Sequence, residues 1–162
     1  MVTPKKTLIL GIGNYLMGDE GIGVHVANKI SLEKLPKNVD VVDGGTGGFH
    51  LLEYFEKYDI VILVDATLDG NPPGTTRLIQ PKFAKDFPAA MSTHDIGLKD
   101  LVSALQLLNK MPQIELFVVS IKTIQQQGIE LTPELQKALP LVIEKIKNLL
   151  VKIYTKPIAV VI

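Results

Sequence analysis

The sequence predicts an α/β domain, a three-layer α/β/α sandwich built on a twisted, mainly parallel sheet of about five strands. Two observations carry this prediction. Short apolar runs, several of them β-branched, alternate along the chain with segments in which apolar residues recur every three or four positions. Strands that alternate with helices are typical of βαβ units, whose right-handed crossovers place helices on both faces of a parallel sheet. The length of 162 residues suits one domain, so we expect a single domain over 1–162.

Five apolar runs are the predicted strands. The clearest is 60–65, which is β-branched and continuously apolar up to its final Asp, as expected of a strand buried on both faces. The weakest and shortest is 76–79. The remaining three predicted strands are 7–13, 39–43 and 114–121.

Four segments have the apolar spacing of helices, namely 21–32, 47–55, 96–108 and a last helix that begins near 132–134. The start of the last helix is marked by Thr132, a good N-cap residue, and by Pro133, which suits the first helical position. The apolar tail 158–162 is open to three interpretations: an edge strand, a partner contact or a disordered end.

Composition excludes several classes of function. Lys plus Arg and Asp plus Glu are both 17, and Arg77 is the single arginine, so the basic excess typical of a nucleic-acid-binding protein is missing. There is no Cys, hence no disulfide, thiolate metal site or cysteine nucleophile, and the cytoplasm is the expected compartment. No uninterrupted apolar stretch approaches 18 residues, so we expect no membrane insertion.

Polar residues follow the predicted strands at the edge where a parallel sheet binds its ligands. The candidates that the topology brings to this edge are Asp19, Glu20, Asp43, Asp65 and His94. Each alone has an ordinary structural explanation as a turn former or helix cap. Together, several carboxylates and one imidazole suit a divalent metal ion, which would also relieve the repulsion between the carboxylates. His25 and His50 lie inside predicted helices and are interpreted as structural.

Common catalytic and nucleotide-binding motifs are missing. Gly11 and Gly13 begin a dinucleotide-type pattern, but Leu16 stands where its third glycine would be, and no P-loop Lys follows. Neither H-E-x-x-H nor G-x-S-x-G occurs, so the standard signatures of zinc proteases and serine hydrolases are missing. We interpret the two glycines as a tight turn that leaves the first strand.

Segment 11–23, Gly-Ile-Gly-Asn-Tyr-Leu-Met-Gly-Asp-Glu-Gly-Ile-Gly, resembles the opening motif of the hydrogenase maturation endopeptidases, which trim the large subunit of nickel–iron hydrogenases. Three further motifs follow in the family's order, at 43–46, 64–66 and 94–98. The chain departs from the family at 120–127, which replaces a Gly-Ile-Glu-Pro-like turn.

The resemblance implies that Glu20, Asp65 and His94 are metal ligands and that Asp43 lies close to the site and supports activity or specificity. It implies a processing endopeptidase that removes a C-terminal extension from the large-subunit precursor, with nickel delivered on that precursor and cadmium or zinc as surrogates. We expect aspartic-type activity, with Asp43 or Asp19 as general base, and a monomeric enzyme. The sequence leaves open which carboxylate is the base and whether nickel is catalytic or only a recognition mark.

Two other functions stay open from the residues alone. One is a non-proteolytic α/β module that binds a nucleotide or a divalent cation, against which the missing glycine and P-loop Lys argue. The other is an assembly factor that binds the precursor without cutting it.

Overall fold

The computed structural model describes residues 4–88, 98–123 and 127–155. The described strands are β1 (Thr7–Gly11), β2 (Val39–Asp43), β3 (Ile60–Thr67), β4 (Thr76–Ile79) and β5 (Gln113–Ser120). The α-helices are α1 (Ile22–Ile30), α2 (Leu52–Lys57), α3 (Leu98–Leu107) and α4 (Pro133–Tyr154). Three short 3₁₀ helices complete the elements: η1 (Gly18–Gly21), η2 (Phe49–Leu51) and η3 (Ala84–Asp86).

The strands form one mixed sheet in the order β2-β1-β3-β5-β4. The first four strands of this order are parallel, and β4 pairs with β5 in the antiparallel sense. A parallel return needs a crossover of about a dozen residues or more. Because the connection over residues 68–75 is shorter than that, β4 runs back antiparallel at the edge of the sheet. The prediction of a mainly parallel sheet of about five strands is confirmed.

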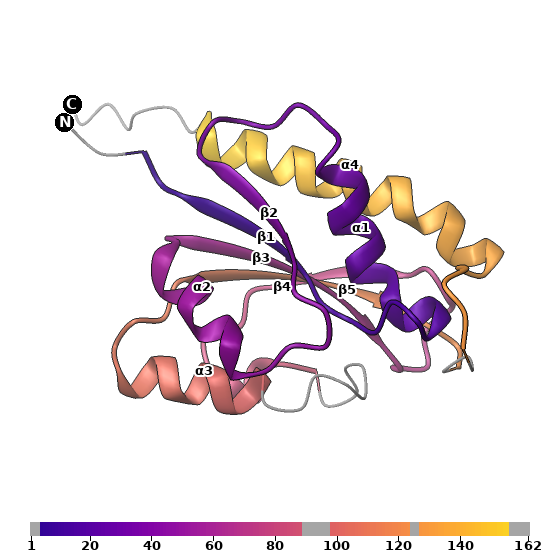
Figure 1. Ribbon diagram of the computed structural model, residues 1–162, viewed down its shortest axis with the longest axis horizontal. Helices are drawn as coiled ribbons and strands as arrows, with labels where there is room; N and C mark the ends of the chain where they lie inside the picture. Colours follow the sequence, from indigo (N-terminus) through magenta and orange to yellow (C-terminus); the bar gives the residue numbers. More distant parts are fainter. Residues whose placement is uncertain (1–3, 89–97, 124–126, 156–162) are drawn as a thin grey trace.

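Helices cover both faces of the sheet, as Figure 1 shows, with α1 and α4 on one face and α2 and α3 on the other. Alternate residues of β3 belong to two separate apolar clusters. Ile62 and Val64 pack with α1 and α4, whereas Val61 and Leu63 pack with the cluster that contains Leu101 of α3. Since every residue of β3 is buried, this strand is the centre of both layers of the core. The predicted three-layer α/β/α sandwich is confirmed.

Several predicted elements have different bounds in the structure; for example, the strand predicted over 7–13 ends at Gly11. The helix predicted over 47–55 begins later, with η2 and then α2, because Gly45, Gly47 and Gly48 have positive φ angles of 55°, 84° and 114°, which no α-helix contains. Strand β3 extends two residues beyond Asp65, because its pairing with β5 continues to Thr67.

The helix predicted over 96–108 is described from Leu98 onward, and its first two residues lie outside the described ranges. The apolar tail 158–162 lies outside them as well. The last helix begins as predicted, with Thr132 at the N-cap position and Pro133 as its first residue.

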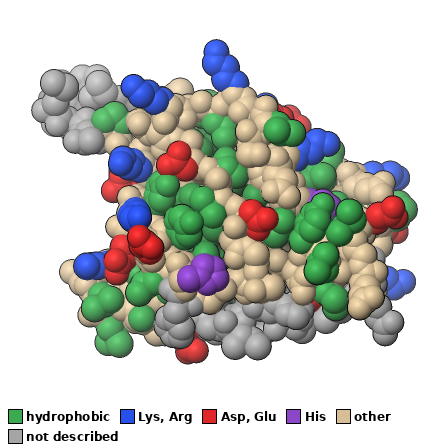
Figure 2. Space-filling view, in the orientation of Figure 1, with side chains coloured by type: hydrophobic (Ala, Val, Ile, Leu, Met, Phe, Trp, Pro, Cys, Tyr) green, Lys and Arg blue, Asp and Glu red, His purple; other side chains and the backbone are tan. Residues whose placement is uncertain are grey.

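The surface carries charges of both signs. On the face shown in Figure 2, Lys, Asp and Glu side chains are interspersed rather than gathered by sign. This distribution agrees with the equal numbers of basic and acidic residues, 17 of each. Within the described parts of the chain, no helix has the length and apolar character needed to cross a membrane.

Candidate metal and peptide site at the carboxyl edge of the sheet

The parallel pairing brings the polar ends of three strands to one edge. Gly11, the last residue of β1, is paired with Asp43 of β2 on one side and with Val64 of β3 on the other. Asp65 therefore lies one residue beyond this row, and β1 separates the two carboxylates. The sheet thus places Asp43 and Asp65 at the edge that the topology predicted, on strands that flank β1.

Glu20 reaches the same edge because η1 folds back against the end of β1. Gly13 has a φ of 143°, and a Cβ at this position would lie 2.1 Å from the carbonyl oxygen of Glu20. A Cβ on Gly23 would lie 2.2 Å from the carbonyl oxygen of Val64 in β3. Only glycine permits such close approach of backbones. The glycines of the opening motif therefore seat η1 and the start of α1 directly on β1 and β3, and they leave the side chain of Glu20 fully buried.

Asp65 is a buried carboxylate whose acceptors are not all engaged. Its side chain has no exposed surface, and Oδ1 accepts a hydrogen bond from the Ala66 amide at 2.8 Å. Oδ2 is buried and has no hydrogen-bond partner among the described residues. Since a buried charge is costly unless it is paired or binds a metal ion, this oxygen marks a position where a cation or a proton donor is expected.

Two of the three predicted metal ligands, Glu20 and Asp65, belong to the described residues. Glu20 and Asp65 supply oxygen donors from two neighbouring elements, since η1 contacts β3. The third predicted ligand, His94, lies outside the described residues. Among the described residues alone, no three His, Cys, Asp or Glu side chains form a group that could hold a metal ion.

Asp19, one of the two predicted general bases, is engaged with the start of α4. It is 3% exposed, its Oδ1 accepts a bond from the Thr132 amide at 2.8 Å, and its Oδ2 accepts one from the Thr132 hydroxyl at 2.8 Å. A carboxylate in this position also faces the positive end of the α4 dipole. These bonds attach Asp19 to the start of α4. Because Asp19 belongs to η1, they also hold η1, which carries Glu20, in place.

Asp43, the other predicted base, lies exposed at the end of β2. Its Oδ1 accepts a hydrogen bond from the Gly45 amide at 2.8 Å, which shapes the glycine-rich turn, and the Gly45 carbonyl accepts one from the Gly13 amide at 2.7 Å. Strand alternation places Asp43 on the face of Val41, toward α1 and α4, whereas Asp65 lies on the opposite face. The two carboxylates share an edge of the sheet but not a face.

A segment near the C-terminal helix contacts the opening motif, which the sequence did not predict. The Gly18 amide donates to the Gly128 carbonyl and the Gly128 amide donates to the Leu16 carbonyl, both at 2.7 Å. Beside them, the ring of His25 packs against Tyr15 with centroids 4.8 Å apart. Burial lowers the pKa of His25 below its ordinary value of 6.5, against a hydrogen bond to the Ile129 backbone that favours the charged form. His25 thus packs beside the contact between the opening motif and the segment at Gly128, and its structural role stays a prediction.

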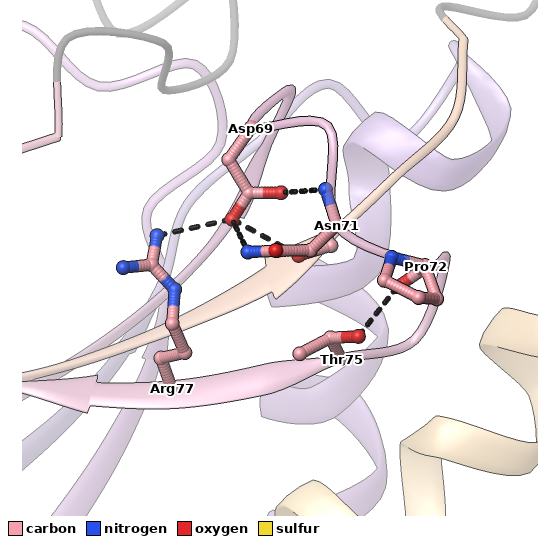
Figure 3. Close-up of polar contacts among 6 residues, drawn as sticks. Asp69, Asn71, Pro72, Thr75 and Arg77 are labelled. Atoms are coloured by element: carbon pink, nitrogen blue, oxygen red, sulfur yellow. Dashed lines mark hydrogen bonds and ion pairs between the residues drawn. The ribbon is translucent and has the colours of Figure 1, made fainter.

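A second polar cluster follows β3 and was also missed by the sequence analysis (Figure 3). Asp69 Oδ2 accepts hydrogen bonds from Arg77 Nη2 at 3.0 Å, from Asn71 Nδ2 at 2.9 Å and from Ser120 Oγ at 3.1 Å, and Oδ1 accepts one from the Asn71 amide at 3.0 Å. Burial alone would raise the pKa of Asp69, but these bonds and the charge of Arg77 outweigh it and hold the pKa below 3.8. The sequence feature that could have pointed to this cluster is Arg77, the single arginine of the chain.

Comparisons with known proteins agree with the fold and identify the family. A family model described as hydrogenase maturation protease matches residues 24–149. The hydrogenase 2 maturation protease of Escherichia coli is 32% identical over 144 residues, which are 87% of this chain and 88% of that protein. The solved structure of the hydrogenase maturating endopeptidase HybD from E. coli superposes with a TM-score of 0.82 at 32% identity, covering 90% of this chain and 91% of the other.

Longer relatives match over part of their length. The hydrogenase expression/formation protein HupD of Bradyrhizobium diazoefficiens is 38% identical over 112 residues, which are 67% of this chain and 58% of that protein. HupD of Rhodobacter capsulatus is 38% identical over 112 residues, which are 53% of its length. The chain therefore spans a little more than half of these two relatives.

Proposed function

This chain belongs to the hydrogenase maturation protease family, and we propose that it is an endopeptidase that removes a C-terminal extension from the nickel-loaded large-subunit precursor of a nickel–iron hydrogenase. The observation that carries the proposal is the pair of fully buried carboxylates, Glu20 and Asp65, at the carboxyl edge of the sheet. Burial of Asp65 Oδ2 without a described partner supports a cation as the group that this edge receives.

In this proposal Glu20, Asp65 and His94 bind the nickel ion that the precursor carries. The chain has no Cys, so it cannot supply the soft thiolate ligands that would hold a resident ion tightly. The precursor must supply the stronger ligands, and the two carboxylates and the imidazole complete the coordination from the enzyme's side. The bound nickel then serves as the mark that distinguishes a loaded precursor from an empty one, and it supplies a Lewis acid next to the peptide.

We assign the general base to Asp43 and a positioning role to Asp19. Both oxygens of Asp19 accept bonds from Thr132, whereas Asp43 is exposed to solvent and uses Oδ1 to accept the Gly45 amide. Asp43 would take a proton from the attacking water while the oxygen of that water bonds to the scissile carbonyl carbon. The same proton would pass to the amine nitrogen as the carbon–nitrogen bond breaks.

The decisive experiment incubates the purified protein with nickel-loaded and with nickel-free precursor and follows the intact mass of the precursor. We expect loss of the extension from the loaded precursor alone and no cleavage of casein. Equal cutting of both precursors would contradict the use of nickel as a mark. A stable complex without any cut would make the protein an assembly factor rather than a protease.

Metal content tests the source of the nickel separately. With three expected ligands and no thiolate, protein purified without added metal should be largely metal-free by elemental analysis. Cadmium or zinc should occupy the site at high concentration, and binding should weaken below about pH 6, where an imidazole becomes protonated. A stoichiometric ion that survives dialysis against a chelator would show that the enzyme carries its own metal.

A further inference from the structure

Arg77 lies in the same row of the sheet as Asp65. Asp65 of β3 is paired with Val118 of β5, and Val118 is paired with Arg77 of β4. Directly paired residues share a face, and Ile79, two residues beyond Arg77, packs in the apolar cluster on the α2 and α3 face. Arg77 therefore lies on the face to which Asp65 belongs, and two strand spacings put their Cα atoms about 10 Å apart.

Asp69 holds one end of the guanidinium of Arg77. The ion pair joins Arg77 Nη2 to Asp69 Oδ2 at 3.0 Å, and Asn71 and Ser120 fix the carboxylate in turn. The Arg77 side chain is 43% exposed. Figure 3 shows its other terminal nitrogen directed away from Asp69. Since a guanidinium has five N–H donors in a rigid fork, the pair leaves donors that can bind a second carboxylate.

We propose that Arg77 binds a carboxylate of the precursor's C-terminal extension, either on a side chain or at the chain end, and thereby contributes to substrate specificity. The inference rests on the proposed function. An extended peptide advances about 3.3 Å per residue, so a peptide that is bound near both Asp65 and Arg77 spans the distance of about 10 Å with about three residues. The carboxylate that Arg77 binds lies that far from the residue held at the nickel site.

The groove beside the β3–β4 connection is an alternative place for the extension. It has a volume of about 580 Å³ and is lined in part by Leu68, Pro72, Ile121, Lys122 and Glu134. Leu68 and Ile121 pack with the α1 and α4 cluster, which lies on the face opposite to Asp65. Unlike this groove, Arg77 lies on the face to which Asp65 belongs, and the exposed Lys122 offers a matched control at the same edge.

The test measures kcat and KM for nickel-loaded precursor with the wild type, Arg77→Gln, Arg77→Lys and Lys122→Gln. We expect Arg77→Gln to raise KM by roughly ten- to a hundredfold with kcat unchanged, as for a lost hydrogen bond between charged groups. Arg77→Lys keeps the charge but not the forked donors, so its KM should lie between those of the wild type and Arg77→Gln. The KM of Lys122→Gln should match that of the wild type. Thermal unfolding of each variant tests whether the fold is intact. Lys147→Gln, which removes a comparably exposed ion pair to Glu33, shows how much the loss of such a pair changes the melting temperature by itself.

A double-mutant cycle identifies the partner of Arg77. Each Asp and Glu of the extension is changed to its amide, and the terminal carboxylate is blocked as an amide. One of these changes should raise the wild-type KM by the same factor, and Arg77→Gln should then add nothing. If Arg77→Gln raised KM by the same factor for every precursor, Arg77 would have a structural role and the inference would be overturned. A rise in KM for Lys122→Gln as large as that for Arg77→Gln would also overturn it.

The same variants separate this inference from the proposed function. If the wild type cuts no precursor, the proposed function fails, and the affinity of fluorescently labelled precursor for the wild type and Arg77→Gln still decides the role of Arg77. Equal affinities would overturn the inference. A tenfold or larger loss that disappears with one amidated precursor would support carboxylate binding without cleavage.

Discussion

Asp65 and Asp69 lie four residues apart on the chain, yet their surroundings are opposite. Asp69 accepts hydrogen bonds from a guanidinium, an amide side chain, a hydroxyl and a backbone amide. Asp65 is fully buried and accepts one described bond, from the neighbouring Ala66 amide, while its Oδ2 has no partner among the described residues. The more buried carboxylate is thus the one with fewer donors.

The difference separates carboxylates that the described part of the protein supplies with donors from one that it leaves with an unsatisfied oxygen. A polar group that folding buries normally finds its partners within the protein, as Asp69 does, and as Asp19 does with Thr132. A buried oxygen without such a partner costs stability, and it persists where a ligand supplies the missing interaction. A change at Asp65 should therefore affect processing more than stability, whereas a change at Asp19 should affect stability more than processing.

The largest effect is expected at the proposed nickel site. Asp65→Asn should lower precursor processing by at least about a hundredfold, because it removes a ligand charge. The same change should leave the melting temperature of the metal-free protein unchanged or higher, since it removes a buried carboxylate that is costly there. Processing assays and differential scanning calorimetry on one preparation measure both. Glu20→Gln and His94→Ala should show the same loss of processing, and full processing by any one variant would remove that residue from the site.

A smaller effect, mainly on stability, is expected at the contact between η1 and α4. Asp19→Ala leaves two donors of Thr132 without their acceptor and should lower the free energy of unfolding by about 2–3 kcal/mol. Thr132→Val removes the hydroxyl alone and should cost about half as much. Urea unfolding measures both changes. If Asp19 were the general base, Asp19→Asn would abolish the pH dependence of kcat, whereas a positioning residue leaves the shape of that profile intact.

Asp69→Asn should have a moderate effect on both properties. The loss of the charge weakens the bonds from Arg77 and Ser120, and because Arg77 is partly exposed we expect a cost of about 1–2 kcal/mol in the free energy of unfolding. Processing should fall less than tenfold, through KM, as the guanidinium loses its fixed position. A loss of processing as large as that of Asp65→Asn would contradict the distinction between a carboxylate that holds Arg77 in position and one that binds the metal ion.

The pH dependence of stability should show the smallest effects, in two separate windows. The pKa of His25 is lowered in the folded state, so the unfolded chain takes up the proton first and stability is lost as the pH falls below about 6.5. The pKa of Asp69 is also lowered, so its contribution is present above its ordinary pKa and is lost as the pH falls below about 4. In a plot of the urea midpoint against pH from 8 to 3, the slope should become smaller below about 6.5 in His25→Gln and below about 4 in Asp69→Asn. An unchanged slope in either variant would assign that window to another group.

The sequence by itself predicted most of the fold and the edge of the sheet at which the described candidate residues lie. Continuous apolar runs such as 60–65 and the helical spacing of apolar residues are local patterns, and the α/β alternation limits the topologies that they can form. The rule that ligands bind at the carboxyl ends of parallel strands predicted that one edge holds Asp19, Glu20, Asp43, Asp65 and His94. Asp43 and Asp65 lie at that edge, η1 carries Asp19 and Glu20 against it, and His94 lies outside the described residues.

Only the tertiary structure decided which of these side chains share surroundings. Asp19 and Thr132 are 113 residues apart on the chain, and no local pattern predicts that one binds the other. The placement of Asp43 and Asp65 on opposite faces follows from strand register, where a shift of one residue exchanges the faces. The row from Asp65 to Arg77 needs the strand order and the antiparallel return of β4 as well. Such relations depend on long-range pairing, and the free energy that selects one pairing comes from packing of the whole core rather than from any single segment.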